Sequence, residues 1–135
     1  MLEDEAIAHV AINALIARYS DGVNRRDAAR WAQCWAPDAV WRLRGRDIEG
    51  RDAILAAWQQ AMGSFDKVWF MAFAGMIYLA PGGDAAQVLT HTFEYLYPLG
   101  GTARLQSGIY EDRIVRRDGA WVFAERSFTA QELPL

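Results

Sequence analysis

The sequence predicts an α+β fold in which N-terminal helices precede a curved antiparallel sheet. Apolar residues recur at helical spacing through much of the N-terminal half, whereas the C-terminal half contains four runs rich in β-branched and aromatic residues. Turn sequences separate these runs, and each run exceeds the usual length of about 5–6 residues, which suits a strongly curved sheet. Helices followed by a strand meander indicate the α+β class. The length of 135 residues predicts one domain, residues 1–135.

Two helices are expected first. Apolar side chains from residue 5 to residue 23 share one helical face, which predicts a long first helix. Asp27 is a favourable N-cap for a second, short helix. In that helix Trp31 and Trp35 would share a face before Pro37 ends it.

A short strand and a third helix come next. Residues 39–43 are rich in strand-forming side chains and end at the turn Arg44-Gly45. Gly50 and Asp52 then open a helix that ends near Gly63, with Asp52 expected as its cap.

Four strands linked as hairpins are expected in the remainder of the chain. The apolar runs cover residues 68–79, 86–97, 102–116 and 120–129. Segments rich in Gly, Pro and Asp separate them, including Asp118-Gly119, a strong signal for a tight hairpin.

Composition excludes several classes of function. The formal charge of −3 argues against nucleic acid, because such binders need a strong basic excess. The acidic N-terminus is unlike a signal peptide, and no run reaches the ~20 apolar residues of a membrane span. A cytoplasmic protein without membrane contact is therefore expected. The two histidines, His9 and His91, lie far apart without a Cys or acidic ligand pattern, so no metal site is expected.

Several strings in this order resemble the SnoaL-like, nuclear-transport-factor-two-like family, which includes ketosteroid isomerase, scytalone dehydratase, limonene epoxide hydrolase and bile-acid dehydratase. The strings are residues 15–19, 35–41, 49–54, 108–112 and 116–121. The resemblance implies a cone of curved sheet wrapped around the helices, with a pocket for a small, largely apolar molecule. It implies no cofactor. The fold hosts many different reactions, so the reaction has to be argued from the site.

The resemblance also suggests site residues. The ketosteroid isomerase pattern places its oxyanion-hole tyrosine at Tyr19 and its protonated acid at Glu111, but the position of its base falls on Leu43, which cannot accept a proton. The dehydratase pattern places its aspartate at Asn24 and its histidine near Phe70. Both acid–base groups of the dehydratases are thus missing, although the amide of Asn24 could orient a hydroxyl or a carbonyl.

Another residue could replace the base. In the run 86–97, Glu94 shares one face with Thr90 and Thr92, whereas His91 lies on the other. If the turn at 98–101 centres between residues 99 and 100, paired residue numbers sum to 199, and Glu111 then shares the pocket face with Glu94. A slip of one residue would instead bring His91 into the pocket as the general base.

The expected walls of the pocket are apolar. Trp41 and Leu43 lie on one face of the first strand, and Trp58 and Phe70 could add to the lining. Together with these residues, the resemblance implies a cofactor-independent lyase or isomerase acting on a small cyclic, mainly apolar substrate such as a polyketide, terpenoid, steroid or aromatic catabolite. The alternative is a non-catalytic ligand binder or a degenerate family member acting as a dimeric binding module, which the missing acid–base pair favours.

A homodimer is expected as well. The face of the 86–97 strand opposite to Glu94 carries an apolar set, which would need a partner if it faced solvent. That set is Leu89, Phe93, Tyr95 and Tyr97, with Tyr110 expected beside it.

Overall fold

The computed structural model describes residues 2–134 and confirms the α+β class. These residues form three helices and seven strands, which are joined by turns. Their bounds are α1 Leu2–Asn24, α2 Ala28–Gln33, β1 Trp35–Leu43, β2 Arg46–Glu49, α3 Arg51–Met62, β3 Phe65–Ala72, β4 Met76–Leu79, β5 Ala85–Pro98, β6 Arg104–Arg117 and β7 Ala120–Pro134.

The segment around the second helix differs from the prediction. Asp27 caps α2 through a side-chain bond to the Arg30 amide, as expected, but the helix ends at Gln33. Trp35 belongs to β1, where it lies beside Phe123 of β7, and the Phe123 amide donates to the Cys34 carbonyl. Tertiary pairing with β7 therefore overrides the helical spacing of the tryptophans.

Two smaller corrections concern the start of the third helix. The turn at Arg44-Gly45 leads into the short strand β2, which the sequence did not predict and which pairs with the end of β1. Gly50, with a φ of 90°, is the N-cap of α3, and no side chain caps that end. Asp52 therefore does not cap α3; it lies in the first turn.

The sheet is mixed. Its strand order is β2-β1-β7-β6-β5-β3, and β4 pairs with β5. The pair β1 and β7 is parallel, whereas the other pairs are antiparallel. The predicted run 68–79 is divided between β3 and β4 by residues 73–75. A Cβ on Gly75 would lie 2.7 Å from Val88 Cγ1, so the chain passes close to β5 at this break.

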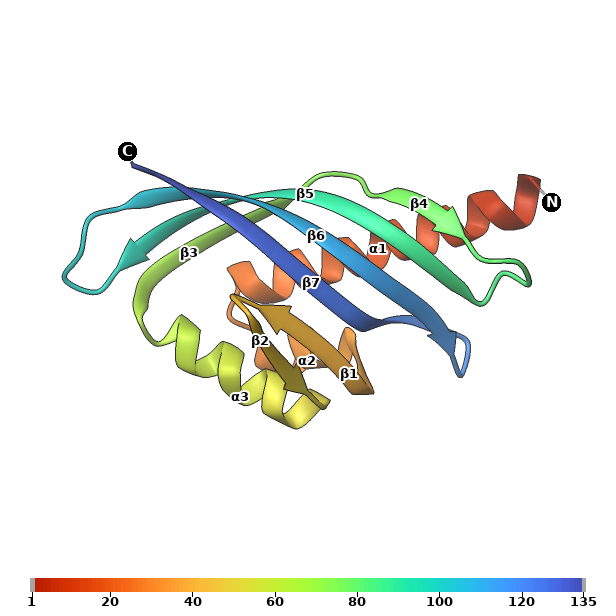
Figure 1. The fold of residues 1–135 in the computed structure, drawn as a ribbon, viewed down its shortest axis with the longest axis horizontal. Coiled ribbons are helices and arrows are strands. Elements are labelled where there is room, and N and C mark those ends of the chain that lie inside the picture. The colour runs from red at the N-terminus through yellow and green to blue at the C-terminus, as the bar shows by residue number, and fades with distance from the viewer. Residues whose placement is uncertain (1, 135) are drawn as a thin grey trace.

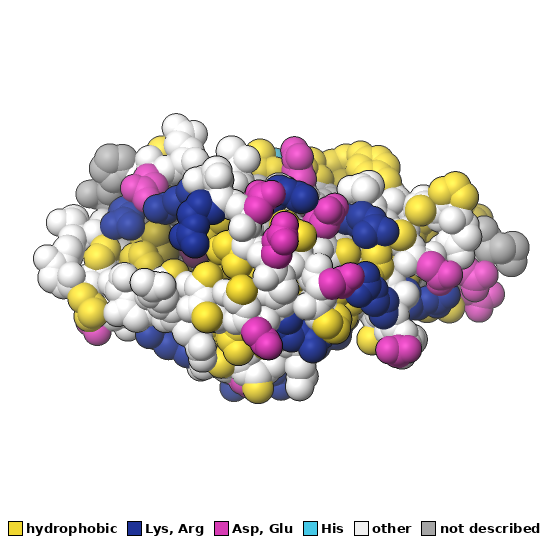
Figure 2. All heavy atoms as spheres, turned by 60° about the horizontal axis from the view of Figure 1, so that its bottom comes forward, with side chains coloured by type: hydrophobic (Ala, Val, Ile, Leu, Met, Phe, Trp, Pro, Cys, Tyr) yellow, Lys and Arg dark blue, Asp and Glu magenta, His cyan; other side chains and the backbone are white. Residues whose placement is uncertain are grey.

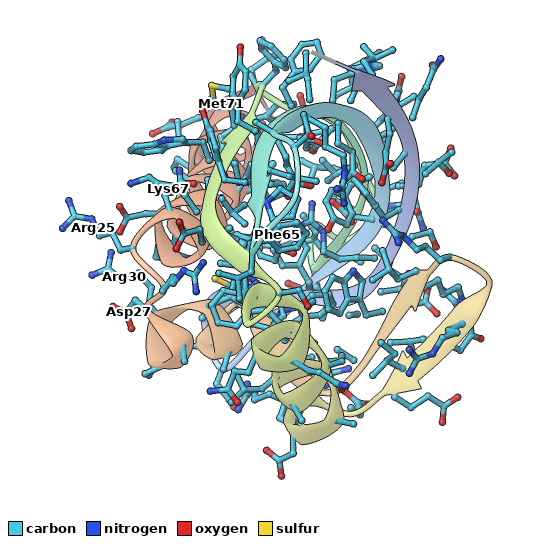
Figure 3. The ribbon with its side chains drawn as sticks, turned by 90° about the vertical axis from the view of Figure 1, so that its left-hand side faces the viewer. Arg25, Asp27, Arg30, Phe65, Lys67 and Met71 are labelled. Carbon is cyan, nitrogen blue, oxygen red and sulfur yellow. The ribbon has the colours of Figure 1, made fainter. Side chains whose placement is uncertain are left out.

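The long strands β5, β6 and β7 curve over the helices (Figure 1), and α1 runs along their concave side. Seen from the end, the strands curl around a filled interior, with α3 and the β1–β2 hairpin below (Figure 3). On β3, Lys67 and Met71 project outward in this view, whereas Phe65 packs against the core. No helix within residues 2–134 is long and apolar enough to span a membrane.

The β5–β6 pairing is offset by one residue from the prediction. Leu89 lies opposite Glu111 and Val88 opposite Asp112, so that paired numbers sum to 200. The connection centres on Gly100, which adopts a φ of 67°, instead of between two residues. Because neighbouring side chains alternate between faces, this offset exchanges the faces of β6. Asp112 points inward and Glu111 points outward.

Candidate functional site

One face of β5 points into the interior. Thr90 and Thr92 are buried and Glu94 is partly buried, whereas His91 between them is exposed. Of the two alternatives for this strand, the structure therefore has Glu94 inside and His91 outside. Glu111 is exposed on the outer face, so the expectation that it shares a face with Glu94 is wrong. The offset pairing is the reason.

Glu94 is a carboxyl group with an unusual proton affinity. Burial raises its pKa to about 7, although a hydrogen bond from Gln106 and the charge of Arg44 both act to lower it. Gln106 Nε2 donates to Glu94 Oε1 across the β5–β6 pair at 3.1 Å. Near neutral pH this carboxyl group is therefore divided between its charged and neutral forms, as a general acid–base group requires.

A depression of about 410 Å³ is lined by Gln106, the hydrogen-bond partner of Glu94, although Glu94 itself does not line it. The left part of Figure 2 looks onto this end of the molecule and shows hydrophobic side chains in a hollow below several Lys or Arg side chains. Gln106 belongs both to the lining and to the hydrogen bond with Glu94. The lining residues are Arg44, Gly45, Gln106, Phe128, Thr129, Ala130 and Glu132.

A buried ion pair lies deeper on the same inner face. Arg126 of β7 donates to both carboxylate oxygens of Asp112, from Nε at 2.7 Å and from Nη2 at 3.0 Å. The exposed fractions of the two side chains are 1% and 0%. Burial alone would lower the pKa of Arg126, but the Asp112 carboxylate outweighs it and holds that pKa above its ordinary value. The guanidinium carbon lies 3.5 Å from the ring centre of Tyr110, a favourable cation–π contact.

Tyr19 and Tyr110 meet above this ion pair. Their hydroxyl oxygens are 3.3 Å apart, and both side chains are buried. Burial raises the pKa of Tyr19, and the Arg126 guanidinium offsets only part of this rise. The Glu94 carboxylate also raises the pKa of both tyrosines, so the three groups are within electrostatic range of one another. Tyr19 therefore keeps its proton at neutral pH and remains a hydrogen-bond donor.

Asn24 has a different local role from the one that the sequence suggested. Its side-chain Oδ1 accepts from the Phe70 amide at 2.6 Å, and its Nδ2 donates to the Phe70 carbonyl at 2.8 Å. Both polar atoms of the amide are thus engaged with the backbone of β3. The amide joins the end of α1 to the sheet and is not free to orient a ligand in this conformation.

The predicted wall residues lie mainly in the aromatic core. Trp58 stacks on Trp31 with ring centres 4.5 Å apart, and Trp41 packs against both Trp31 and Trp35. Phe70 is buried against Tyr19. None of these three predicted wall residues, Trp41, Trp58 and Phe70, lines the depression of 410 Å³. Leu43 is partly buried and directly precedes the lining residue Arg44.

The structure adds site residues that sequence reasoning missed. Gln106, Asp112, Arg126 and Phe128 all lie on the inner face of β6 or β7. Alternation along β6 could have grouped Gln106, Tyr110 and Asp112 on one face, but the shifted register was needed to turn that face inward. Arg126 gives no such signal, because an arginine in a strand is ordinarily solvated. Within residues 2–134, no group of three His, Cys, Asp or Glu side chains is arranged to hold a metal ion.

Solved structures share this fold along nearly the whole chain. A proposed scytalone dehydratase from Novosphingobium aromaticivorans has a TM-score of 0.91 and 17% identity, covering 100% of this chain and 92% of its own. A hexachlorocyclohexane dehydrochlorinase of type 2 has a TM-score of 0.90 and 21% identity, with coverage of 100% and 93%. A protein of unknown function from Mycobacterium tuberculosis has a TM-score of 0.86 and 25% identity, with coverage of 96% and 75%.

The sequence itself identifies the family. No curated protein sequence matches the chain. The model of the SnoaL-like domain matches residues 4–127, which is most of the chain and includes every element from α1 to the middle of β7. Together with the cone-shaped α+β fold, this match shows that the chain belongs to the SnoaL-like family.

Proposed function

We propose that the protein is a cofactor-independent lyase or isomerase that moves a proton on a small cyclic, mainly apolar molecule bound in the depression beside Glu94. The position and proton affinity of Glu94 carry this proposal. It is an inward-facing carboxyl group next to an open depression, and its pKa is about 7. A general base is most effective when its pKa lies near the working pH.

The chemistry needs one group that takes a proton and others that stabilise the resulting charge. The Glu94 carboxylate would take a proton from carbon, leaving the electron pair on a substrate that delocalises it toward oxygen. In an isomerisation the protonated Glu94 returns the proton to another carbon, and in an elimination it passes the proton to the departing group. Arg126 and Tyr19 are buried and do not line the depression, so the guanidinium charge and the tyrosine hydroxyl would stabilise the developing negative charge at longer range.

The names of two structural relatives support an elimination. Scytalone dehydratase and hexachlorocyclohexane dehydrochlorinase both denote enzymes that remove a small molecule, water or hydrogen chloride, from a cyclic compound. Their identity to this chain is 17% and 21%, so they support the fold directly and the reaction class only by analogy.

The alternative is a non-catalytic binding module, and Asn24 is the observation that favours it. Asn24 stands where the dehydratase pattern has its aspartate, and its Nδ2 and Oδ1 each make a hydrogen bond to the Phe70 backbone. Thermal denaturation with a panel of cyclic ketones, lactones and alcohols separates the two functions, because a ligand of the folded state raises its stability. We expect a stabilising compound to be converted to product. Stabilisation without conversion would favour the binding module.

The exposed aromatic surface of the sheet supports a homodimer, which we propose as the state in solution. Trp69 and Met71 of β3 and Phe73 just after it are about half exposed, at 45–54%, and Phe93 and Tyr95 of β5 are each 36% exposed. Monomers rarely leave so large an apolar patch in water. Tyr110, which was expected on this surface, instead lies inside at 3% exposure because of the offset register.

Light scattering tests the dimer directly. We expect a mass of twice 15.2 kDa for the wild type, because pairing covers the aromatic surface. The double variant Phe93→Lys/Tyr95→Lys is expected to be monomeric, since each lysine would have to be buried on pairing. A matched control places two lysines on the exposed side of α3, at Gln59 and Gln60, and should remain dimeric. A wild-type mass near 15.2 kDa would contradict the proposal.

A further inference from the structure

Two buried side-chain oxygen atoms near Glu94 have no hydrogen-bond partner in the described part of the chain. Gln106 is 6% exposed and Thr92 is 2% exposed, and both Gln106 Oε1 and Thr92 Oγ1 lack a hydrogen bond. Leaving a buried polar atom unpaired costs free energy, so such atoms are uncommon in folded proteins and call for an explanation.

The orientation of the Gln106 amide follows from chemistry. When Glu94 is ionised, its carboxylate can only accept hydrogen bonds, so the amide turns its Nε2 toward Glu94. This form predominates above the Glu94 pKa of about 7. The orientation leaves Oε1, which is also only an acceptor, as the unpaired atom. A partner for Gln106 Oε1 must therefore be a donor.

The two unpaired atoms lie close together on one surface. Glu94 pairs with Gln106, and Thr92 pairs with Gly108, so Thr92 and Gln106 are diagonal neighbours on the inner face. Gly108 has no side chain, and the ring of Phe128 packs directly over it. A Cβ on Gly108 would lie 2.8 Å from Thr92 Oγ1 and 2.5 Å from Cζ of Phe128. The ring of Phe128 therefore fills the position over Gly108, next to Thr92 Oγ1.

Phe128 covers Gly108 and also lines the depression. It is only partly buried, and its ring packs on Tyr110 at 4.5 Å. Since one side of the ring faces open space, a rotation of its side chain toward the depression would expose Thr92 and Gln106 to a ligand. The same movement would place that ligand beside the Glu94 carboxylate.

We propose that Gln106 and Thr92 select ligands that carry a hydroxyl group, so that the substrate of this depression is a hydroxylated flat ring. A hydroxyl group donates to Gln106 Oε1 and accepts from Thr92 Oγ1 at the same time. A ketone or an ether oxygen accepts from Thr92 but leaves Gln106 Oε1 unpaired, and a plain hydrocarbon ring satisfies neither atom. This inference rests on the proposed function, because it assigns a substrate class to the same depression.

Binding of matched compounds tests the selection without any need for turnover. The probes are 2-naphthol, its methyl ether 2-methoxynaphthalene, and naphthalene, with dissociation constants measured by calorimetry or by tryptophan fluorescence at about pH 8, where Glu94 is mainly ionised. We expect 2-naphthol to bind at least about tenfold more tightly than the ether. The variants Gln106→Leu and Thr92→Val should each remove most of this preference. Gln131→Leu, an exposed glutamine on the neighbouring strand, is the matched control and should keep it.

A second measurement on the wild type applies if these variants fail to fold. In protein labelled with ¹³C at glutamine, the Cδ signal of Gln106 should move on addition of 2-naphthol and not on addition of the ether. Equal affinities for the two compounds, a preference that survives in Gln106→Leu, or no binding of any probe would overturn the inference. If Glu94→Gln loses turnover but the wild type shows no preference for the hydroxyl compound, the proposed function stands and only the selection of hydroxylated ligands is refuted.

Discussion

Replacement of Glu94 by Gln is expected to lower turnover by about a hundredfold or more, and to stabilise the protein at about pH 8. The first effect follows because the amide keeps the shape and the contact with Gln106 but cannot take a proton, and general acid–base groups typically contribute at least this factor. The second effect follows because the wild type must keep a charged carboxyl group partly buried at that pH.

The pH dependence of stability has a defined sign. The pKa of Glu94 rises from 4.5 to about 7 on folding, so the folded protein binds this proton more tightly than the unfolded chain. The contribution of Glu94 to stability is therefore most favourable below about pH 4.5, declines as the pH rises to about 7, and is constant above that. Glu94→Gln should remove this decline and gain roughly 1–3 kcal/mol at about pH 8.

Urea unfolding of the wild type and the variant at about pH 5 and pH 8 measures the difference in the free energy of unfolding. Turnover of any compound identified in the panel of cyclic ketones, lactones and alcohols measures the loss of activity. The control is Glu111→Gln, which removes an exposed carboxylate from the outer face of the neighbouring strand. It should change neither activity nor the pH dependence of stability. Full activity in Glu94→Gln would exclude Glu94 as the acid–base group.

Replacement of Asp112 by Asn is expected to destabilise the protein by about 3–5 kcal/mol, because it leaves the guanidinium of Arg126 buried without a counter-charge. The aromatic rings of Tyr19, Tyr110 and Phe123 around the guanidinium offset only part of this loss. Denaturant unfolding of the variant, with the slope checked for two-state behaviour, gives the change in the free energy of unfolding.

Two further variants show whether the unpaired charge is the cause. The double variant Asp112→Leu/Arg126→Met removes both charges and should recover much of the stability, as replacements of buried ion pairs by apolar residues often do. Asp84→Asn breaks the ion pair with Arg116 at the surface, where the aspartate side chain is 70% exposed, and should have a much smaller effect. Equal losses in Asp112→Asn and Asp84→Asn would contradict the explanation.

Local sequence patterns were sufficient for most of the elements and for the alternation of side chains along β5. The Gly, Pro and Asp clusters located the turns of the long hairpins, and Asp118 and Gly119 adopt the positive φ angles of 52° and 78° that such a tight turn requires. Strict alternation grouped Glu94 with Thr90 and Thr92. These features depend on neighbouring residues alone, which is why the sequence can predict them.

The contacts between distant residues could be decided only by the tertiary structure. The sequence determined by itself an α+β chain with curved hairpins and the grouping of Glu94 with Thr90 and Thr92 on one face of β5, but it left open whether that face or the face of His91 points inward. The turn around Gly100 decided that Asp112 and not Glu111 faces inward, since an offset of one residue exchanges the faces of a strand. Asp112 pairs with Arg126 on the next strand. Asn24 forms hydrogen bonds with the Phe70 backbone, 46 residues away. No periodicity encodes such partners, because the curvature of the whole sheet sets which side chains meet inside it.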